Sequence, residues 1–201
     1  SFATSTASRR GEAAIRTELS MNSGRDNLLR EVASYYGDKL ARHGATPQGV
    51  DWNGESGQLL RFAQLMRVVE TGDHFTLNDL GCGYGALVDF LSSRFESFDY
   101  RGYDVSTEMV AAGRERYPQS QSVSFSVGAL PLSPANYGVA SGIFNVRMEI
   151  GDEEWLEYVI SMLDVLDRTS LDGFAFNCLT SYSDPERMRS CSQSQPGQKR
   201  M

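Results

Sequence analysis

Short apolar runs alternate with helix-like patterns over residues 75–179, and this alternation limits the possible folds more than any other feature. Five apolar runs predict strands, at 75–80, 98–105, 123–127, 139–144 and 173–179. Apolar residues at helical spacing predict helices over 85–95, 106–116 and 152–167. Strands and helices that alternate in this way form a parallel sheet covered on both faces. We therefore predict an α/β fold with a doubly wound, mainly parallel sheet of about five strands.

One connection does not fit a full crossover helix. Residues 128–138 separate the third and fourth predicted strands and contain Pro131 and Pro134. Proline inside a helix removes a hydrogen bond and clashes with the preceding turn. We therefore predict a loop or a single helical turn in this connection.

Two amphipathic helices precede the α/β region. The first covers 22–44 and ends at Gly44, residues 45–54 contain turn formers and predict a loop, and a second helix follows. We predict a helical N-terminal lid over 22–70 and a ligand-binding domain over 71–190. The polar, aperiodic ends at 1–21 and 191–201 predict a disordered leader and tail.

Composition excludes several classes of protein. The chain has 201 residues, enough to bury a core without disulfide or metal staples. Its net charge of −7 and pI near 4.9 argue against a broad nucleic-acid surface, and no apolar run reaches the roughly 18 residues that span a membrane. The three cysteines lack metal-type spacing. They predict reduced thiols in a cytoplasmic protein without a bound metal.

A glycine-rich turn follows the first predicted strand, in the run Asp79-Leu80-Gly81-Cys82-Gly83-Tyr84-Gly85. Glycines allow the backbone to approach a ligand closely, and the helix that follows presents unpaired N–H groups. Gly81, Gly83 and Ala86 also match the relaxed dinucleotide pattern. The turn alone therefore leaves a nicotinamide-dependent oxidoreductase open.

Two acids distinguish the possible ligands. Asp79 lies at the mouth of the first strand, where its charge would disfavour a pyrophosphate and favour an ammonium group. Asp104 closes the next strand, and an acid about twenty residues after the glycines can accept hydrogen bonds from ribose hydroxyls. S-adenosylmethionine combines an ammonium group and a ribose without a phosphate. We predict it as the cofactor.

Residues 73–180 resemble the class I S-adenosylmethionine-dependent methyltransferases, through the run D-x-G-x-G-x-G and Asp104. The stretches ASGIFNVR and FAFNCLTSYSDPERM are similar to those of bacterial small-molecule methyltransferases. The resemblance implies a Rossmann-like sheet of order 3-2-1-4-5-7-6. The chain shows no pattern for strands 6 and 7, so we expect a shortened sheet with an open edge and reduced stability.

The resemblance also implies a set of cofactor contacts. The first motif supplies Asp79, Gly81, Gly83 and Gly85, and Asp104 would bind the ribose. Adenine would lie near Val105, Ser106, Met109, Gly128, Ala129 and Leu130, and the methionine part would lie above Ser141 and Ile143. The family often has a polar residue where this chain has Ala129, so the adenine amine contact is expected from main chain or solvent. Two residues of the lid are further cofactor candidates, Tyr36 and Arg61.

The acceptor is predicted to be a small molecule, because a lid and an acidic surface suit a covered, concave pocket. Trp52, Asn145 and Glu149 are candidates for binding it. His43 is a candidate for a general base, and Asn145 and Glu149 are candidates for a catalytic role that the sequence does not specify. Trp52 could instead anchor its loop, and His43 could simply end its helix. Methyl transfer from a sulfonium needs mainly alignment and exclusion of water. We predict transfer to an oxygen or nitrogen atom, with a non-catalytic binding protein of the same fold as the alternative.

Overall fold

The computed structural model of the protein describes residues 23–52, 54–70, 73–148 and 150–178. The predicted leader over 1–21 and tail over 191–201 lie outside these residues. The same holds for the segment after residue 178, on which the expectation about further strands depends. Within the described residues, no helix is both long enough and apolar enough to cross a lipid bilayer.

The centre of the protein is a sheet of five strands, and every neighbouring pair is parallel. The strands are β1 (Phe75–Leu80), β2 (Phe98–Asp104), β3 (Val123–Val127), β4 (Ala135–Phe144) and β5 (Ser170–Cys178), in the order β3-β2-β1-β4-β5. The sequence-based prediction of a doubly wound, parallel α/β sheet is therefore confirmed. The strand order also agrees with the first five strands that the resemblance implies.

The prediction for the connection before β4 is wrong at its end. Residues 135–138 belong to β4 rather than to a loop or helical turn. Both prolines precede the strand, so neither interrupts its hydrogen bonds. The start of β4 is fixed to β1 because Asn136 Oδ1 accepts hydrogen bonds from the Thr76 amide and hydroxyl, each at 2.9 Å. The prolines mark where the strand begins.

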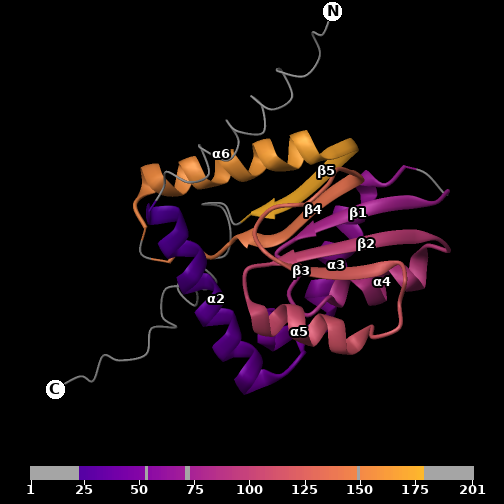
Figure 1. Cartoon of the computed structure of the whole chain (residues 1–201), viewed down its shortest axis with the longest axis horizontal. Helices are drawn as coiled ribbons and strands as arrows, with labels where there is room; N and C mark the ends of the chain where they lie inside the picture. The colour runs from indigo at the N-terminus through magenta and orange to yellow at the C-terminus, as the bar shows by residue number, and fades with distance from the viewer. Residues whose placement is uncertain (1–22, 53, 71–72, 149, 179–201) are drawn as a thin grey trace, which may run out of the picture.

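Helices cover the two faces of the sheet (Figure 1). The helices α3 (Glu55–Leu65), α4 (Ala86–Arg94) and α5 (Thr107–Arg116) pack on one face, and α6 (Asp152–Thr169) packs on the other. The long helix α2 (Ser23–His43) crosses the carboxyl ends of the strands. The sheet therefore has helices on both faces and a further helical layer over the edge where its strands end.

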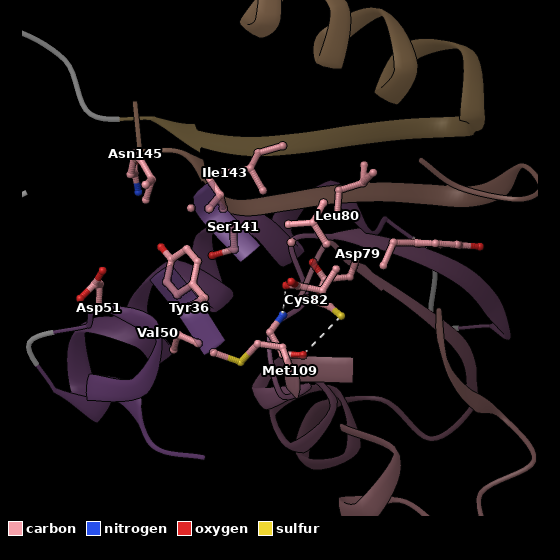
Figure 2. A pocket seen from close by; sticks show the side chains of 18 of the residues that line it. Tyr36, Val50, Asp51, Asp79, Leu80, Cys82, Met109, Ser141, Ile143 and Asn145 are labelled. Atoms are coloured by element: carbon pink, nitrogen blue, oxygen red, sulfur yellow. Dashed lines mark hydrogen bonds between the residues drawn. The ribbon is translucent and has the colours of Figure 1, made fainter. Parts of the chain in front are cut away.

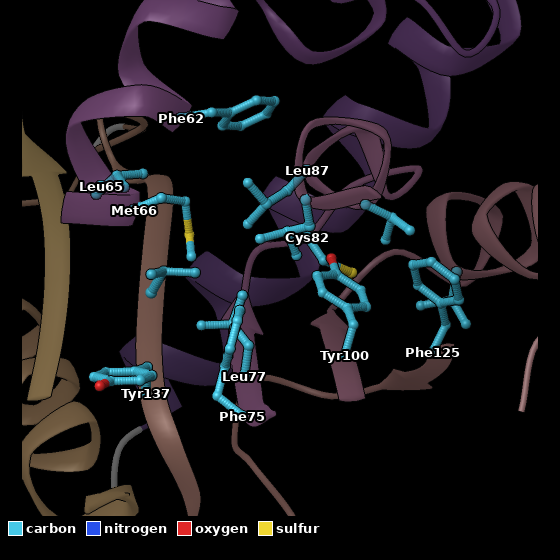
Figure 3. Packing of buried hydrophobic residues seen from close by; sticks show 14 residues of the cluster. Phe62, Leu65, Met66, Phe75, Leu77, Cys82, Leu87, Tyr100, Phe125 and Tyr137 are labelled. Atoms are coloured by element: carbon cyan, nitrogen blue, oxygen red, sulfur yellow. The ribbon is translucent and has the colours of Figure 1, made fainter. Parts of the chain in front are cut away.

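The core has two clusters of buried side chains, one on each face. On the α3–α5 face, Phe75, Leu77 and Tyr100 of the sheet pack with Leu87 and Phe62 of the helices (Figure 3). On the α6 face, the buried residues are Leu28, Leu80, Ala140, Phe144, Tyr158, Met162 and Leu166. Burial of apolar area on this scale is the main favourable contribution to folding. It also fixes the positions of the strand ends.

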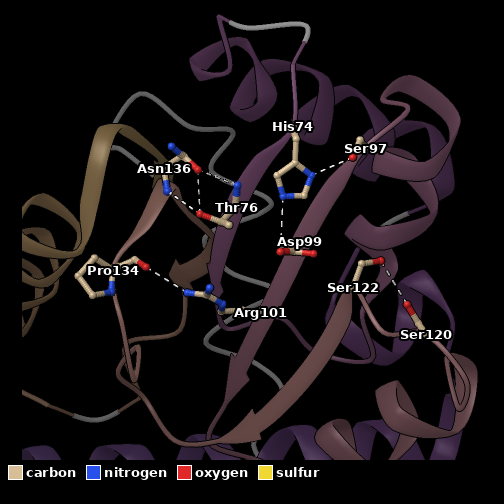
Figure 4. Close-up of polar contacts among 9 residues, drawn as sticks. All are labelled: His74, Thr76, Ser97, Asp99, Arg101, Ser120, Ser122, Pro134 and Asn136. Atoms are coloured by element: carbon tan, nitrogen blue, oxygen red, sulfur yellow. Dashed lines mark hydrogen bonds and ion pairs between the residues drawn. The ribbon is translucent and has the colours of Figure 1, made fainter.

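Polar contacts gather at the amino ends of β1 and β2 (Figure 4). His74 Nδ1 lies 2.8 Å from Ser97 Oγ, and its Nε2 lies 3.5 Å from Asp99 Oδ2. Arg101 donates to the Pro134 carbonyl at 3.0 Å. These contacts lie at the edge of the sheet opposite the glycine turn. They join strand starts and are structural.

The connection between α2 and α3 is more ordered than the predicted loop over 45–54. Pro47–Val50 form a 3₁₀ turn, with proline at its start, where a missing N–H costs nothing. Asp51 ends the turn in the left-handed region, with φ of 61°. The second predicted helix is also interrupted, because α3 ends at Leu65 and Met66–Val68 form another 3₁₀ turn. The name "cover" is used below for α2, residues 47–52 and α3.

Candidate functional site

A pocket lies at the carboxyl ends of β1, β2 and β4, beneath the cover (Figure 2). The name "floor" is used below for residues 79–85 and 104–106, which form the base of the pocket, with Gly85 and Ser106 lying just beneath the lining. In parallel α/β sheets, ligands bind outside the carboxyl ends of the strands where the strand order reverses. Here the order reverses between β1 and β4. The pocket therefore occupies the place that this architecture reserves for a ligand.

The glycine turn needs glycine for two reasons. Gly81, Gly83 and Gly85 all have positive φ, at 73°, 54° and 81°, where a Cβ introduces strain. In addition, a Cβ on Gly81 would overlap the Ile143 side chain, and one on Gly85 would lie 2.6 Å from the Phe125 ring. Adjacent amides of the turn, Gly81 N and Cys82 N, donate to the Tyr103 carbonyl at 2.8 and 3.1 Å. The turn is thereby fixed against β2.

Asp104 is held by the backbone of the floor. Its Oδ2 accepts from the Gly83 amide at 2.8 Å and its Oδ1 from the Ser106 amide at 2.9 Å. Burial raises the pKa of Asp104, and these backbone hydrogen bonds oppose that rise. Each carboxylate oxygen retains a lone pair for a further donor. The residue is 9% exposed and lines the pocket, so it is positioned to receive hydroxyl groups.

Asp79 is more deeply buried, at 2% exposure, and only one of its oxygens is satisfied. Oδ2 accepts from the Tyr100 hydroxyl at 2.7 Å, whereas Oδ1 has no hydrogen-bond partner among the described residues. Burial raises the pKa of Asp79 to about 7, the Tyr100 hydrogen bond lowers it, and the charge of Asp104 raises it. A buried acceptor without a partner is costly. The arrangement therefore suits a cationic donor that enters from the pocket.

Cys82 lies inside the turn and is not a nucleophile candidate. Its side chain is buried and packs against Gly102 of β2. It fills the space that a side chain on Gly102 would need. Burial raises the pKa of the thiol well above its ordinary value, and the charges of Asp104 and Asp79 raise it further. A thiol in these surroundings stays protonated and unreactive. Cys82 is therefore a packing residue of the turn.

The pocket brings together most of the side chains and glycines singled out from the sequence. Those that line it are Tyr36, Trp52, Arg61, Asp79, Gly81, Gly83, Asp104, Val105, Met109, Gly128, Ala129, Ser141, Ile143 and Asn145. Ser106 is fully buried just below the pocket lining. Its hydroxyl accepts a hydrogen bond from the Met109 amide at 3.2 Å and caps the start of α5. The residues come from both the floor and the cover, and from strand ends far apart in the chain.

Three of the candidates are placed differently. Gly85 begins α4 and packs against Phe125 below the turn, and Leu130 packs in the cluster on the α6 face, so neither lines the pocket. His43 is the last residue of α2, where it is exposed and does not line the pocket. The His43 candidate for a general base is therefore not supported. Glu149 lies outside the described residues.

Side-chain contacts hold the cover together. Asp51 accepts from the Tyr35 hydroxyl and from Lys39 Nζ, both at 2.6 Å. The Arg61 guanidinium lies 4.5 Å from the centre of the Trp52 ring, a cation–π contact. Tyr36 and Asp51 lie on the side of the pocket opposite Asp79 (Figure 2). These contacts join α2, the 3₁₀ turn and α3 above the pocket.

Sequence analysis missed several residues of the site. Tyr100 bonds to Asp79, Gln58 is a buried amide of α3, and Tyr158 and Met162 of α6 form part of the pocket wall. The apolar stripe of α6 was visible as a pattern, but nothing in it marks which members reach the pocket. For Tyr100, the available signal was its place in the strand that also carries Asp104.

The comparisons with known proteins agree with this geometry. A family model described as a methyltransferase domain matches residues 78–169. A protein of Mycobacterium tuberculosis (strain ATCC 25618 / H37Rv), named "Putative methyltransferase Rv1506c", is 50% identical over 124 residues, which cover 62% of this chain and 75% of that protein. The region that the family model matches includes the glycine turn and ends at the last residue of α6.

Two solved structures of ligand complexes have the same fold. The DhpI complex with SAM and HEP matches with a TM-score of 0.55 and 16% identity, over 89% of this chain and 76% of that chain. Magnesium protoporphyrin IX methyltransferase (ChlM) from Synechocystis PCC 6803, with bound SAH, matches with a TM-score of 0.58 and 14% identity, over 84% and 80% of the two chains. At these identities the similarity is one of fold.

Proposed function

Because the chain belongs to the class I S-adenosylmethionine-dependent methyltransferases, we propose that it methylates an oxygen or nitrogen atom of a small, largely apolar molecule held between the floor and α6. S-adenosylmethionine is its cofactor. The observation that carries the proposal is the pair of buried carboxylates, Asp79 and Asp104, which open into one covered pocket.

The residues of the floor fit this cofactor. The unpartnered Asp79 Oδ1 suits the ammonium group, and the free lone pairs of Asp104 suit the ribose hydroxyls. Gly81 and Gly83 present backbone without a side chain to the pocket, at positive φ values that other residues adopt only with strain. Met109 and Ala129 would lie beside the adenine. When bound, the cofactor supplies a methyl group on a sulfonium, which is already a good leaving group.

The far side of the pocket supports an apolar acceptor. This side is lined by apolar residues of α2 and by two residues of α6, namely Leu28, Leu29, Val32, Tyr158 and Met162. Apolar walls with few polar groups are typical of small-molecule sites, and they exclude water from a displacement reaction. The part of the chain that we call the cover would act as the lid predicted from the sequence.

The described residues favour alignment over proton transfer as the source of catalysis. Burial raises the pKa of Tyr158 to about 12, so its hydroxyl stays protonated and can donate a hydrogen bond to the acceptor. Asn145 can orient an acceptor but cannot remove a proton at neutral pH. Holding the acceptor atom in line with the methyl group supplies much of the rate by proximity alone.

Calorimetry with S-adenosylhomocysteine tests the assignment of the floor. Asp104→Asn leaves one amide oxygen where two carboxylate oxygens now hold the Gly83 and Ser106 amides. We expect a loss of affinity of roughly 10- to 100-fold, as for a hydrogen-bonded charged group. Asp99→Asn, on the same strand at the opposite edge, should bind as the unmodified protein does. If the unmodified protein fails to bind, or Asp104→Asn binds equally well, the assignment is wrong.

A methyl-transfer assay tests the acceptor class. The panel should pair apolar phenols, alcohols and amines with polar molecules of similar size, such as sugars and amino acids. We expect turnover only among the apolar members. Turnover restricted to charged or strongly polar molecules would contradict the proposal.

A further inference from the structure

We propose that Tyr100 is a positioning residue for the cofactor: its hydroxyl holds one oxygen of Asp79, so that the other oxygen faces the pocket and receives the ammonium group. The inference rests on the proposed function, because it assigns a purpose to the deepest polar contact of that site. Tyr100 itself does not line the pocket. It acts through Asp79.

The geometry of the two strands places the contact. Leu77 pairs with Tyr100 and Asp79 pairs with Gly102 in the parallel register of β1 and β2. Residues two apart on a strand share a face, so all four lie on the same side of the sheet. Gly102 has no side chain beside Asp79, so Tyr100 is the β2 side chain on this face that reaches the carboxylate.

The contact is enclosed on all sides. Tyr100 is 1% exposed and belongs to the core cluster, where its ring lies 5.7 Å from that of Phe125 (Figure 3). Its hydroxyl donates to Asp79 Oδ2 at 2.7 Å. Water is therefore excluded from Oδ2, and the direction of the carboxylate is set by Tyr100. This leaves Oδ1, without a partner among the described residues, as the atom available to a ligand.

The charges around Asp79 make this hydrogen bond important. Burial raises the pKa of Asp79 to about 7, and the Tyr100 hydroxyl is the contact that lowers it. Burial also raises the pKa of Tyr100 well above its ordinary value, so the hydroxyl remains a donor. The other titratable or charged groups that line the pocket are Tyr36, Asp51, Arg61, Cys82, Tyr84, Tyr103, Asp104 and Tyr158. Of these, Asp104 raises the pKa of Asp79.

Loss of the Tyr100 hydroxyl should therefore change both the charge and the orientation of the Asp79 carboxyl. In Tyr100→Phe the ring still packs against Phe125, but Asp79 loses the donor that favours its ionised form. The carboxyl then stays protonated to a higher pH. A neutral carboxyl attracts an ammonium group far less than a carboxylate does. Binding of a ligand with the amino-acid tail should weaken at neutral pH and recover as the pH rises.

The test is calorimetry of two ligands from about pH 6 to about pH 9. S-adenosylhomocysteine carries the ammonium group, and 5′-methylthioadenosine lacks the amino-acid tail. For the unmodified protein, we expect the affinity for S-adenosylhomocysteine to rise through a midpoint near 7. For Tyr100→Phe, the midpoint should move upward by about one pKa unit, so the affinity should fall about fivefold at pH 7 and about tenfold well below the midpoint. Affinity for 5′-methylthioadenosine should change less than about twofold.

A matched variant controls for the loss of a buried phenol. Tyr137→Phe removes a hydroxyl from the same cluster, where the Tyr137 ring packs against Phe75 with ring centres 5.9 Å apart. It should leave both ligands and the pH midpoint unchanged. If Tyr100→Phe does not fold, Asp79→Asn provides the second test, because with Tyr100 present it should bind S-adenosylhomocysteine weakly and without the midpoint near 7.

The outcomes separate this inference from the proposed function. If the unmodified protein binds neither ligand, the proposed function fails. If it binds both, the inference is overturned when Tyr100→Phe keeps the unmodified pH profile or weakens both ligands equally. In the second test, a pH midpoint that persists in Asp79→Asn overturns it as well. A selective, pH-dependent loss for the ligand with the ammonium group supports it.

Discussion

The floor and the cover of the pocket are built in different ways. The floor uses buried backbone contacts: the Gly81 and Cys82 amides donate to the Tyr103 carbonyl, and the Gly83 amide donates to the Asp104 carboxylate. The cover uses contacts between side chains near the surface, such as Asp51 with Lys39, whose side chains are 28% and 21% exposed. Backbone contacts in the interior are short, fixed and screened from water, whereas contacts near the surface are weakened by solvent.

This difference indicates a division of tasks. A floor that is set by φ angles and amide positions tolerates little change, which suits the recognition of one invariant cofactor. A cover that is set by side chains on helices can change shape at low cost, which suits the recognition of an acceptor. Substitutions in the floor should therefore have large effects on stability and cofactor binding, and those in the cover small effects on both.

The largest effect is expected for Gly81→Ala. The added Cβ would be strained at φ of 73° and would overlap Ile143. We expect the free energy of unfolding to fall by about 2 to 5 kcal/mol and binding of S-adenosylhomocysteine to disappear. Chemical denaturation and calorimetry measure the two effects. Gly57→Ala is the matched control in the cover, because a Cβ there meets open space on a helix, and it should stabilise the protein by up to about 1 kcal/mol.

Equal effects of these two glycine substitutions would break the comparison between floor and cover. A Gly81→Ala protein that folds and binds normally would mean that the turn can move away from Ile143. The double substitution Gly81→Ala with Ile143→Ala refines the result, since it removes the overlap and leaves the backbone strain. We expect it to recover part of the lost stability.

The next effect is a pH dependence of stability caused by Asp79. The pKa of this carboxyl rises from 3.8 to about 7 on burial, so between these values the folded chain holds a proton that the unfolded chain has released. The stability from this proton is present at low pH and is lost as the pH rises through 7. Relative to Asp79→Asn, the unmodified protein should lose on the order of 2 to 4 kcal/mol between about pH 4 and about pH 8.

Urea denaturation of the two proteins at several pH values measures this loss without a ligand. Asp104 is present in both proteins, so its own titration cancels in the comparison except for its coupling to Asp79. Parallel stability curves for the two proteins would show that Asp79 titrates near its ordinary value. The floor would then be more solvated than its burial indicates.

A smaller effect is expected in the cover for Asp51→Asn. Asparagine tolerates the left-handed backbone at this position, but it loses the ion pair with Lys39. We expect a loss of less than about 1 kcal/mol in the free energy of unfolding, since exposed ion pairs contribute little. Asp38→Asn removes a longer ion pair, with Arg42 one turn further along α2, and should lower the free energy of unfolding even less. A loss above about 2 kcal/mol would place Asp51 among the rigid elements of the site.

The smallest effect is expected for Arg61→Met, which removes the charge above the Trp52 ring. Methionine retains much of the length of the side chain, and the loss includes the cation–π contribution of about 0.5 to 1 kcal/mol. Thermal denaturation measures this change, and Arg67→Met on the exposed 3₁₀ turn controls for loss of charge. Identical melting temperatures for the two variants would show that the contact with Trp52 contributes nothing measurable.

The floor could be anticipated from sequence because its determinants are local. Asp79 and the glycines lie in one short run, and Asp104 closes the next strand, so their convergence follows once the strands are parallel neighbours. The same reasoning could not separate Gly83, which borders the pocket, from Gly85, which packs on Phe125. Spacing places residues on a turn but does not give the direction in which each one faces.

Other parts of the site depend on contacts between distant segments. Tyr100 reaches Asp79 through the register of β1 and β2, and Met162 joins the pocket through the packing of α6. A single sequence contains the patterns of these elements but not their relative positions. The start of β4 at residue 135 was missed for a similar reason. Pro134 is equally compatible with a loop that continues after it and with a strand that begins directly after it.

The pair of amides that Asp104 holds has a practical consequence for detecting ligands. The Gly83 and Ser106 N–H groups both point at this single side chain, so whatever enters to share its oxygens must alter the electron density around both protons at once. In a nitrogen–proton correlation spectrum, these two peaks should move together on titration with a nucleoside. Occupancy of the sugar subsite would then be visible before any methyl acceptor is known.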